Sequence, residues 1–152
     1  MILMSFDWLP PSANHAYFTI MSGSGRSKHP VRVLTNEGKK FKRETSAELL
    51  RKYPQELRVF KPDTPYAVHS FMYFPNLLNS GWPEKAQTRY KRLDADNRLK
   101  LFLDSLKDAA GVDDSSFMDI RVVKDLGPER TDIYVWNMEE ETLPIRHLVY
   151  PA

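Results

Sequence analysis

The segment from Asp96 to Ala110 constrains the fold most, because it has the clearest helical pattern in the chain. Its apolar side chains recur at the spacing of one helix face, at Leu99, Phe102, Leu103, Leu106 and Ala110. Gly111 follows at once, and glycine commonly ends a helix because it tolerates the left-handed backbone conformation. The sequence therefore predicts an amphipathic helix over residues 96–110.

Strand patterns lie on both sides of this helix. Residues 2–9 alternate between apolar and polar side chains, and residues 66–74 are rich in aromatic and β-branched ones. Both patterns are typical of strands. Further strands are predicted at residues 31–34, 117–124 and 131–136.

A second helix is predicted over residues 35–52, with Thr35 as its N-cap and with Leu49 and Leu50 among its apolar positions. Residues 22–30 are rich in Gly, Ser and basic residues, and residues 76–92 contain Gly and Pro without a clear period. We expect both segments to be loops, and long loops in compact domains are often functional.

The length of 152 residues fits one compact domain that can bury a core without covalent staples. Cysteine is absent, which excludes disulfides and thiolate metal sites. The first residues lack the basic and long apolar stretches of a signal peptide, and no apolar run reaches the length of a membrane span. We therefore expect a cytoplasmic protein.

The net charge of +2 conceals an uneven distribution. Residues 26–52 contain nine basic and three acidic side chains, and residues 85–100 contain six basic and two acidic ones. Two basic segments on a nearly neutral chain suggest one face that binds a polyanion. The alternative is two solvated charged surfaces without a partner, and the charges alone do not decide between them.

Acidic residues gather at the two ends of the first predicted helix. Asp94 and Asp96 stand two positions apart at its start, where extended backbone would point both to one side. Asp113 and Asp114 follow its end. A helix of this length spans about 22 Å, so Asp114 can join the first pair only through tertiary packing or from a neighbouring subunit.

Such a set of side chains suits phosphodiester hydrolysis. Hard divalent cations such as Mg²⁺ prefer carboxylate oxygens, and these ions polarise phosphates and activate water. Lys100 stands four residues after Asp96, so both lie on the same side of the helix. Its charge could stabilise the negative charge that develops in the transition state.

A structural explanation of the same residues is also open. Asp94 or Asp96 could cap the helix, and Asp96, Lys100 and Asp104 could form a surface ladder of charges. Asp113 and Asp114 could be turn residues. The spacing alone favours this explanation over a metal site.

The joint pattern resembles the RusA family of Holliday-junction resolvases. The family motif Asp-x-Asp-Asn-x-x-Lys matches residues 94–100, Asp-x-Leu matches residues 104–106, and the Gly followed by an Asp pair matches Gly111 and residues 113–114. Three further segments are similar to the family, at residues 9–14, 35–41 and 117–124.

This resemblance implies an α+β fold for residues 1–138, with a mixed sheet of about four to five strands and two main helices, followed by a tail at residues 139–152. It implies a homodimer that uses Mg²⁺, with Mn²⁺ as a substitute, and that makes paired nicks in four-way DNA junctions. Asp94, Asp96 and Asp114 would be the metal-binding catalytic carboxylates, and Lys100 the essential cation. Asn97, Asp113 and Asn14 would have secondary roles.

The basic segments would hold the DNA backbone. The expected DNA-binding residues are Lys39, Lys40, Lys42, Arg43, Arg89, Lys91 and Arg92. Two other functions stay open at this stage: a non-catalytic junction-binding protein with the same fold, and a nuclease for flaps or other branched DNA.

Overall fold

The computed structural model describes residues 1–140, without the side chains of Ala13, Asn14 and Arg26. The predicted tail at 139–152 therefore lies almost wholly outside the described residues. The elements, in chain order, are β1 (Ile2–Phe6), α1 (Ala13–Ala16), β2 (Tyr17–Ser22), η1 (Gly25–Ser27), β3 (His29–Leu34), α2 (Asn36–Lys52), α3 (Pro54–Leu57), β4 (Tyr66–Phe74), α4 (Ala95–Ala110), η2 (Asp114–Ser116), β5 (Phe117–Leu126) and β6 (Arg130–Asn137).

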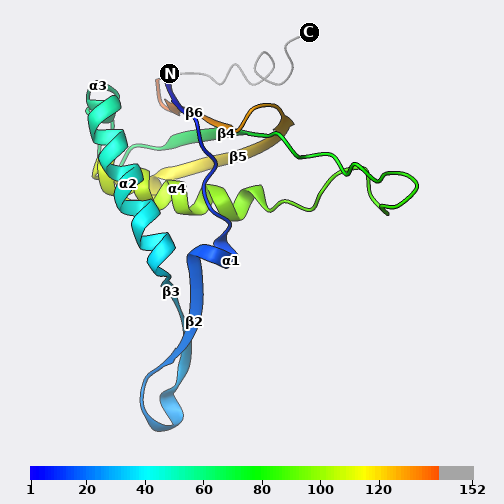
Figure 1. The fold of residues 1–152 in the computed structure, drawn as a ribbon. Coiled ribbons are helices and arrows are strands. Elements are labelled where there is room, and N and C mark those ends of the chain that lie inside the picture. The colour runs from blue at the N-terminus through cyan, green and yellow to red at the C-terminus, as the bar shows by residue number, and fades with distance from the viewer. Residues whose placement is uncertain (141–152) are drawn as a thin grey trace.

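A four-stranded mixed sheet is the centre of the molecule, with the strand order β1-β6-β4-β5. Strands β4 and β5 are parallel, and the other neighbours are antiparallel. Because α4 joins two parallel neighbours, it returns the chain from the end of β4 to the start of β5. Helices α2 and α4 lie on the same side of this sheet (Figure 1). The predicted α+β fold with a mixed sheet and two main helices is confirmed.

The core lies between the sheet and these two helices. Phe102 of α4 is fully buried, and its ring centroid lies 5.5 Å from that of Phe6 in β1. Trp8 bridges to α2, because its indole N–H donates a hydrogen bond of 3.0 Å to Glu48. The apolar stripe of α4 is therefore the surface that fixes this helix on the sheet.

Both predicted helices form, and the residues that were expected to cap and end them do so. Thr35 caps α2, since its hydroxyl accepts a hydrogen bond of 3.0 Å from the backbone N–H of Gly38. Gly111 ends α4 in the left-handed conformation, with a φ of 69°. Of the two adjacent leucines near the end of α2, Leu49 is fully buried and Leu50 is 56% exposed, because consecutive helical residues point about 100° apart.

The interpretation of residues 22–30 as a loop was wrong in part. Strands β2 and β3 pair along six residues each and form a separate two-stranded sheet, with only a short turn around η1. This hairpin extends away from the main sheet (Figure 1). Most of β2 is exposed, so no buried face imposed the alternation that identifies a strand from sequence.

The connection from β5 to β6 passes across the end of β4, which lies between them. Gly127 sits where this connection crosses Tyr73, and a Cβ atom at Gly127 would lie 3.2 Å from the Tyr73 ring. A side chain at this crossing would therefore require the Tyr73 ring to move by a few tenths of an ångström. Among the described helices, none combines the length and the apolar character needed to cross a bilayer.

Candidate active site

The N-terminus of α4 holds two of the three predicted catalytic carboxylates. Asp94 is the N-cap residue, yet its side chain makes no capping hydrogen bond. Asp94 and Asp96 are both exposed, on either side of the buried Ala95. Capping therefore does not explain Asp94, and its carboxylate faces solvent.

The extended backbone that we expected across these two residues is not found. The helix begins at Ala95, so Asp96 already lies in its first turn. Residues two apart on a helix point about 200° apart around the axis. Any convergence of Asp94 and Asp96 on one ligand therefore depends on the N-cap conformation of Asp94 and not on strand geometry.

Lys100 lies on the same side of α4 as Asp96, as predicted. Both side chains line a groove of about 390 Å³ between α4 and β5. The remaining lining is apolar and comes from both elements, through Leu99, Leu103, Ile120 and Val122. A carboxylate and an ammonium group thus stand together at the rim of an apolar groove.

Asp113 and Asp114 lie at the opposite end of α4. Asp113 caps η2, because its carboxylate accepts a hydrogen bond of 3.0 Å from the backbone N–H of Ser115. Hydrogen bonding with Ser115 holds the pKa of Asp113 below its usual range. Asp114 lies 3.8 Å from the ammonium group of Lys107 and is 63% exposed. Asp113 thus has a structural role, and Asp114 presents a carboxylate to solvent.

The three carboxylates do not meet within one chain. Helix α4 has 16 residues, which corresponds to about 24 Å, and it separates Asp114 from Asp94 and Asp96. Among residues 1–140, no three acidic or histidine side chains form a group that could hold a metal ion. Carboxylate oxygens are suitable ligands for a hard cation such as Mg²⁺. However, one chain places only Asp94 and Asp96 at the same end of α4, and Asp114 lies at the other end.

A family model described as Endodeoxyribonuclease RusA matches residues 9–136. The chain belongs to the RusA endodeoxyribonuclease family. This match covers most of the chain, including both main helices, the whole of the α4 motif and β6 as far as Trp136, and it confirms the resemblance found in the sequence. Among curated proteins, no match was found.

In this RusA-family chain, three contacts hold the N-terminus of α4 in place. The guanidinium of Arg98 donates to the backbone carbonyl of Pro10, and it also lies 5.6 Å from the centre of the Phe74 ring. The ammonium group of Lys124, in β5, donates a hydrogen bond of 3.0 Å to the backbone carbonyl of Leu93. These contacts fix the backbone on both sides of Asp94 and Asp96.

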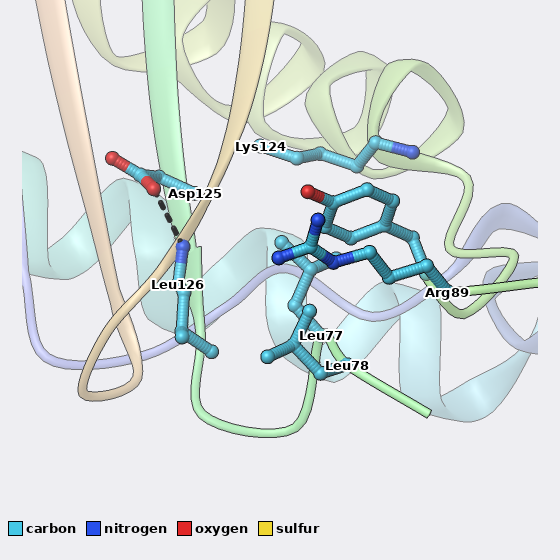
Figure 2. Close-up of a pocket in the computed structure, with 7 residues that line it drawn as sticks. Leu77, Leu78, Arg89, Lys124, Asp125 and Leu126 are labelled. Carbon is cyan, nitrogen blue, oxygen red and sulfur yellow. Dashed lines mark hydrogen bonds between the residues drawn. The ribbon is translucent and has the colours of Figure 1, made fainter. Parts of the chain in front are cut away.

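Lys124 was not among the predicted site residues, although residues 117–124 resemble the family. Its position became clear only when the sheet brought the end of β5 beside Leu93, 31 residues away in the chain. Lys124 and Arg89 both line a pocket of about 490 Å³, and Figure 2 shows their side chains there with those of Leu77 and Leu78. Two cations therefore line one pocket, and one of them, Lys124, contacts the residue before Asp94.

Residues 76–92 form an arm that is more ordered than the predicted loop. The backbone N–H of Asn79 donates to the carbonyl of Arg89, and that of Lys91 donates to Leu77, both at 2.9 Å. The arm extends from the body beyond the N-terminus of α4 (Figure 1). Arg89 lies over the ring of Trp82, at 5.8 Å, and over that of Tyr90, at 5.5 Å.

The other predicted DNA-binding residues differ in their surroundings. Lys91, Arg92, Lys39, Lys40 and Arg43 are exposed. Lys42 instead forms an ion pair with Asp108 at 2.8 Å, which joins α2 to α4. Lys42 is therefore part of the helix packing as well as of the basic segment. Asn97 is half-buried, and the side chain of Asn14 lies outside the described part of the chain.

Proposed function

We propose that this protein is an Mg²⁺-dependent endonuclease that resolves four-way DNA junctions by paired nicks, as a homodimer. The observation that carries the proposal is the family match over residues 9–136 together with Asp96 and Lys100 at the rim of one groove. A four-way junction has two equivalent strands to cut, and a two-fold dimer offers two equivalent sites.

Asp94 and Asp96 would be the ligands of the metal ion in each chain. Bound Mg²⁺ supplies polarisation of the scissile phosphate and activation of the attacking water. Both carboxylates are exposed, so a phosphate and a hydrated cation can reach them. The hydrogen bond of Lys124 to Leu93 and the contact of Arg98 with Pro10 keep this backbone in place before DNA binds.

Lys100 would stabilise the charge that develops on the phosphate oxygens during hydrolysis. We expect Lys100→Ala to lower the single-turnover cleavage rate more than tenfold, equivalent to about 1.4 kcal/mol of barrier, with little change in junction affinity. The matched control is Lys61→Ala, an exposed lysine outside the site. Equal losses in rate and affinity for Lys100→Ala would instead assign this lysine to ground-state phosphate binding.

The exposed basic residues of α2 and of the arm would bind the phosphate backbone. Each neutralised phosphate releases counterions, so junction affinity should fall steeply with salt, roughly 10³-fold or more between 50 and 200 mM salt if about six phosphates are contacted. The double substitution Lys91→Glu with Arg92→Glu should weaken binding to junctions of every sequence. An affinity that does not change over this salt range would contradict a phosphate-dominated interface.

Cleavage assays test the proposal as a whole. Four-way, flap and linear DNA of matched sequence should be incubated with the protein in Mg²⁺, in Mn²⁺ and in a chelator. We expect paired nicks in the four-way junction with either metal and none in the chelator. Preferred cleavage of flaps would show a different branched substrate, and binding without any cleavage would show a junction-binding protein that is not an enzyme.

A further inference from the structure

The pocket between the arm and the end of β5 has no part in the chemistry proposed so far. Its volume is about 490 Å³, and pockets that bind small molecules have about 300–1,000 Å³. Apolar side chains from both elements line it, including Leu78 of the arm and Leu126 of β5. The pocket is therefore large enough and apolar enough to hold part of a ligand.

Tyr90 contributes an aromatic ring to this pocket. The side chain is 53% exposed, but the backbone that carries it is fixed. Tyr90 and Leu78 form an antiparallel bridge, and the hydroxyl of Thr88 donates a hydrogen bond of 2.9 Å to the carbonyl of Tyr90. An exposed ring on paired backbone is a suitable surface for a nucleobase, because every base has a face that stacks on such a ring.

Two cations line the same pocket, and both have hydrogen-bond donors to spare. The guanidinium of Arg89 lies over the rings of Tyr90 and Trp82 and pairs with no carboxylate in the described part of the chain. Figure 2 shows the Arg89 side chain extending from the arm toward β5. Lys124 donates one hydrogen bond to the carbonyl of Leu93, and an ammonium group has three donors. Both cations can therefore bind phosphate oxygens.

Asp125 also lines the pocket, but its carboxylate is already bound. It accepts a hydrogen bond of 2.7 Å from the backbone N–H of Leu126, and Figure 2 shows it directed away from the ammonium group of Lys124. This agrees with strand geometry, in which adjacent residues point to opposite faces. The pocket thus combines apolar and aromatic surface with positive charge, which suits a nucleotide.

We propose that this pocket holds one unpaired nucleotide of the branched DNA, with its base against Tyr90 and its phosphates bound by Arg89 and Lys124. The inference rests on the proposed function for the DNA substrate, but its test needs no cleavage. The pocket adjoins the motif, since Lys124 contacts Leu93, the residue before Asp94. The bound nucleotide therefore lies close to the phosphate that is cut.

A nucleotide in this pocket distinguishes branched DNA from a plain duplex. In a duplex the neighbouring bases cover both faces of each base, so free energy is needed to unstack and unpair it. The cost is lowest for a base that is already unpaired, as at a branch point. Stacking on a ring tolerates every base, so the pocket selects the structure of the DNA and not its sequence.

The surroundings of the pocket favour a DNA strand over a protein segment as the occupant. Lys91 and Arg92 follow Tyr90 directly, and both are exposed. These side chains lead from the pocket to Asp94 and can bind the phosphates of the flanking nucleotides. A basic surface that continues beyond the pocket is complementary to a polyanion.

Binding of short DNAs in the presence of a chelator tests the pocket. The DNAs share one sequence: a perfect duplex, the same duplex with one extra unpaired thymidine, and the same bulge with an abasic nucleotide, which keeps the phosphate but has no base. We expect the wild type to bind the thymidine bulge at least about fivefold more tightly than the abasic bulge, the lower end of what one base gains by stacking on an aromatic ring. Equal affinities for the two bulges would overturn the inference.

Tyr90→Ala should remove this preference for the base. Its affinity for the thymidine bulge should fall about fivefold or more, while its affinities for the abasic bulge and the perfect duplex stay at the wild-type values, which also shows that the variant is folded. Tyr90→Phe keeps the ring and should keep the preference. A preference that survives in Tyr90→Ala would place the base elsewhere and overturn the assignment.

The matched control is Phe18→Ala, an aromatic residue of β2 that is 48% exposed and does not line the pocket. It should leave all three affinities unchanged. Equal losses for Phe18→Ala and Tyr90→Ala would mean that exposed aromatic side chains contact DNA in general, which would overturn a dedicated pocket.

Arg89→Gln tests the phosphate contact separately from the base. It should weaken binding of the thymidine and abasic bulges alike, and it should reduce the salt dependence of the affinity by about one phosphate contact. A loss confined to the thymidine bulge would overturn the assignment of Arg89 to phosphate.

Thymidine monophosphate distinguishes a free nucleotide from a nucleotide within DNA. Added at the concentration of the bulged duplex, it should not compete, because it lacks the flanking phosphates that the exposed basic residues bind. Competition at that concentration would assign the pocket to a free nucleotide and overturn its role in DNA binding. A wild-type protein that prefers the thymidine bulge but cuts no branched DNA would instead overturn the proposed function, while the pocket assignment would still stand.

Discussion

Asp96→Asn is expected to abolish cleavage in Mg²⁺ while leaving the fold and junction binding intact. The substitution keeps the size of the side chain but removes the charge that a hard cation needs. We expect the single-turnover rate to fall more than about a hundredfold, or about 2.7 kcal/mol of barrier. Asp94→Asn and Asp114→Asn should give the same loss if all three carboxylates serve one site.

Stability should change little in these variants, because the three carboxylates are exposed. Exposed substitutions away from structural contacts usually alter the free energy of unfolding by less than about 0.5 kcal/mol. Junction affinity should hold or rise, since negative charge is removed from beside the phosphates. Cleavage and binding are measured on gels with the same protein preparations, and thermal unfolding is followed in parallel.

The control is Asp63→Asn, outside the motif. Asp63 has a positive φ of 56°, a conformation that asparagine tolerates well, so this substitution should not disturb the backbone. Asp132 would be a poor control, because it is buried and lies 2.8 Å from Arg130 in an ion pair. If Asp96→Asn cuts junctions as fast as wild type, the catalytic chemistry lies elsewhere in the molecule.

The parts of the fold that were predicted correctly depend on local signals. Thr35 and Gly111 mark helix ends through contacts within a few residues, and β4 follows its run of aromatic and β-branched residues. The side-by-side placement of Asp96 and Lys100 also follows from helical spacing alone. Each of these features requires only a short stretch of chain to be known.

The parts that were not predicted depend on long-range arrangement. The order β1-β6-β4-β5 places the end of β5 beside Leu93 and gives Lys124 its position, and no short segment encodes that. Hairpin β2–β3 was not recognised in full because its exposed faces carry no alternation. The separation of Asp114 from Asp94 was expected from the helix length, and the structure shows no packing within the described chain that overcomes it.

The packing of α4 has a direct consequence for the site, because one helix carries both a core contact and the side chains that we propose to be catalytic. Phe102 is fully buried, and its ring packs against those of Phe6 at 5.5 Å and Trp8 at 6.5 Å. Asp96 and Lys100 are carried by the same helix, and they line the groove beside β5. Loosening this contact should therefore shift both proposed catalytic side chains relative to the sheet.

Phe102→Ala is expected to lower the free energy of unfolding by about 3–5 kcal/mol, because it removes a buried ring and leaves a cavity. That is a large fraction of the roughly 5–15 kcal/mol that stabilises a typical domain. Urea unfolding measures it, with a lower midpoint and an unchanged slope. The matched control is Leu50→Ala, a leucine of α2 that is 56% exposed and should cost less than about 0.5 kcal/mol. Equal losses for the two variants would contradict the packing of α4 on β1, and with it the route by which the core positions Asp96 and Lys100.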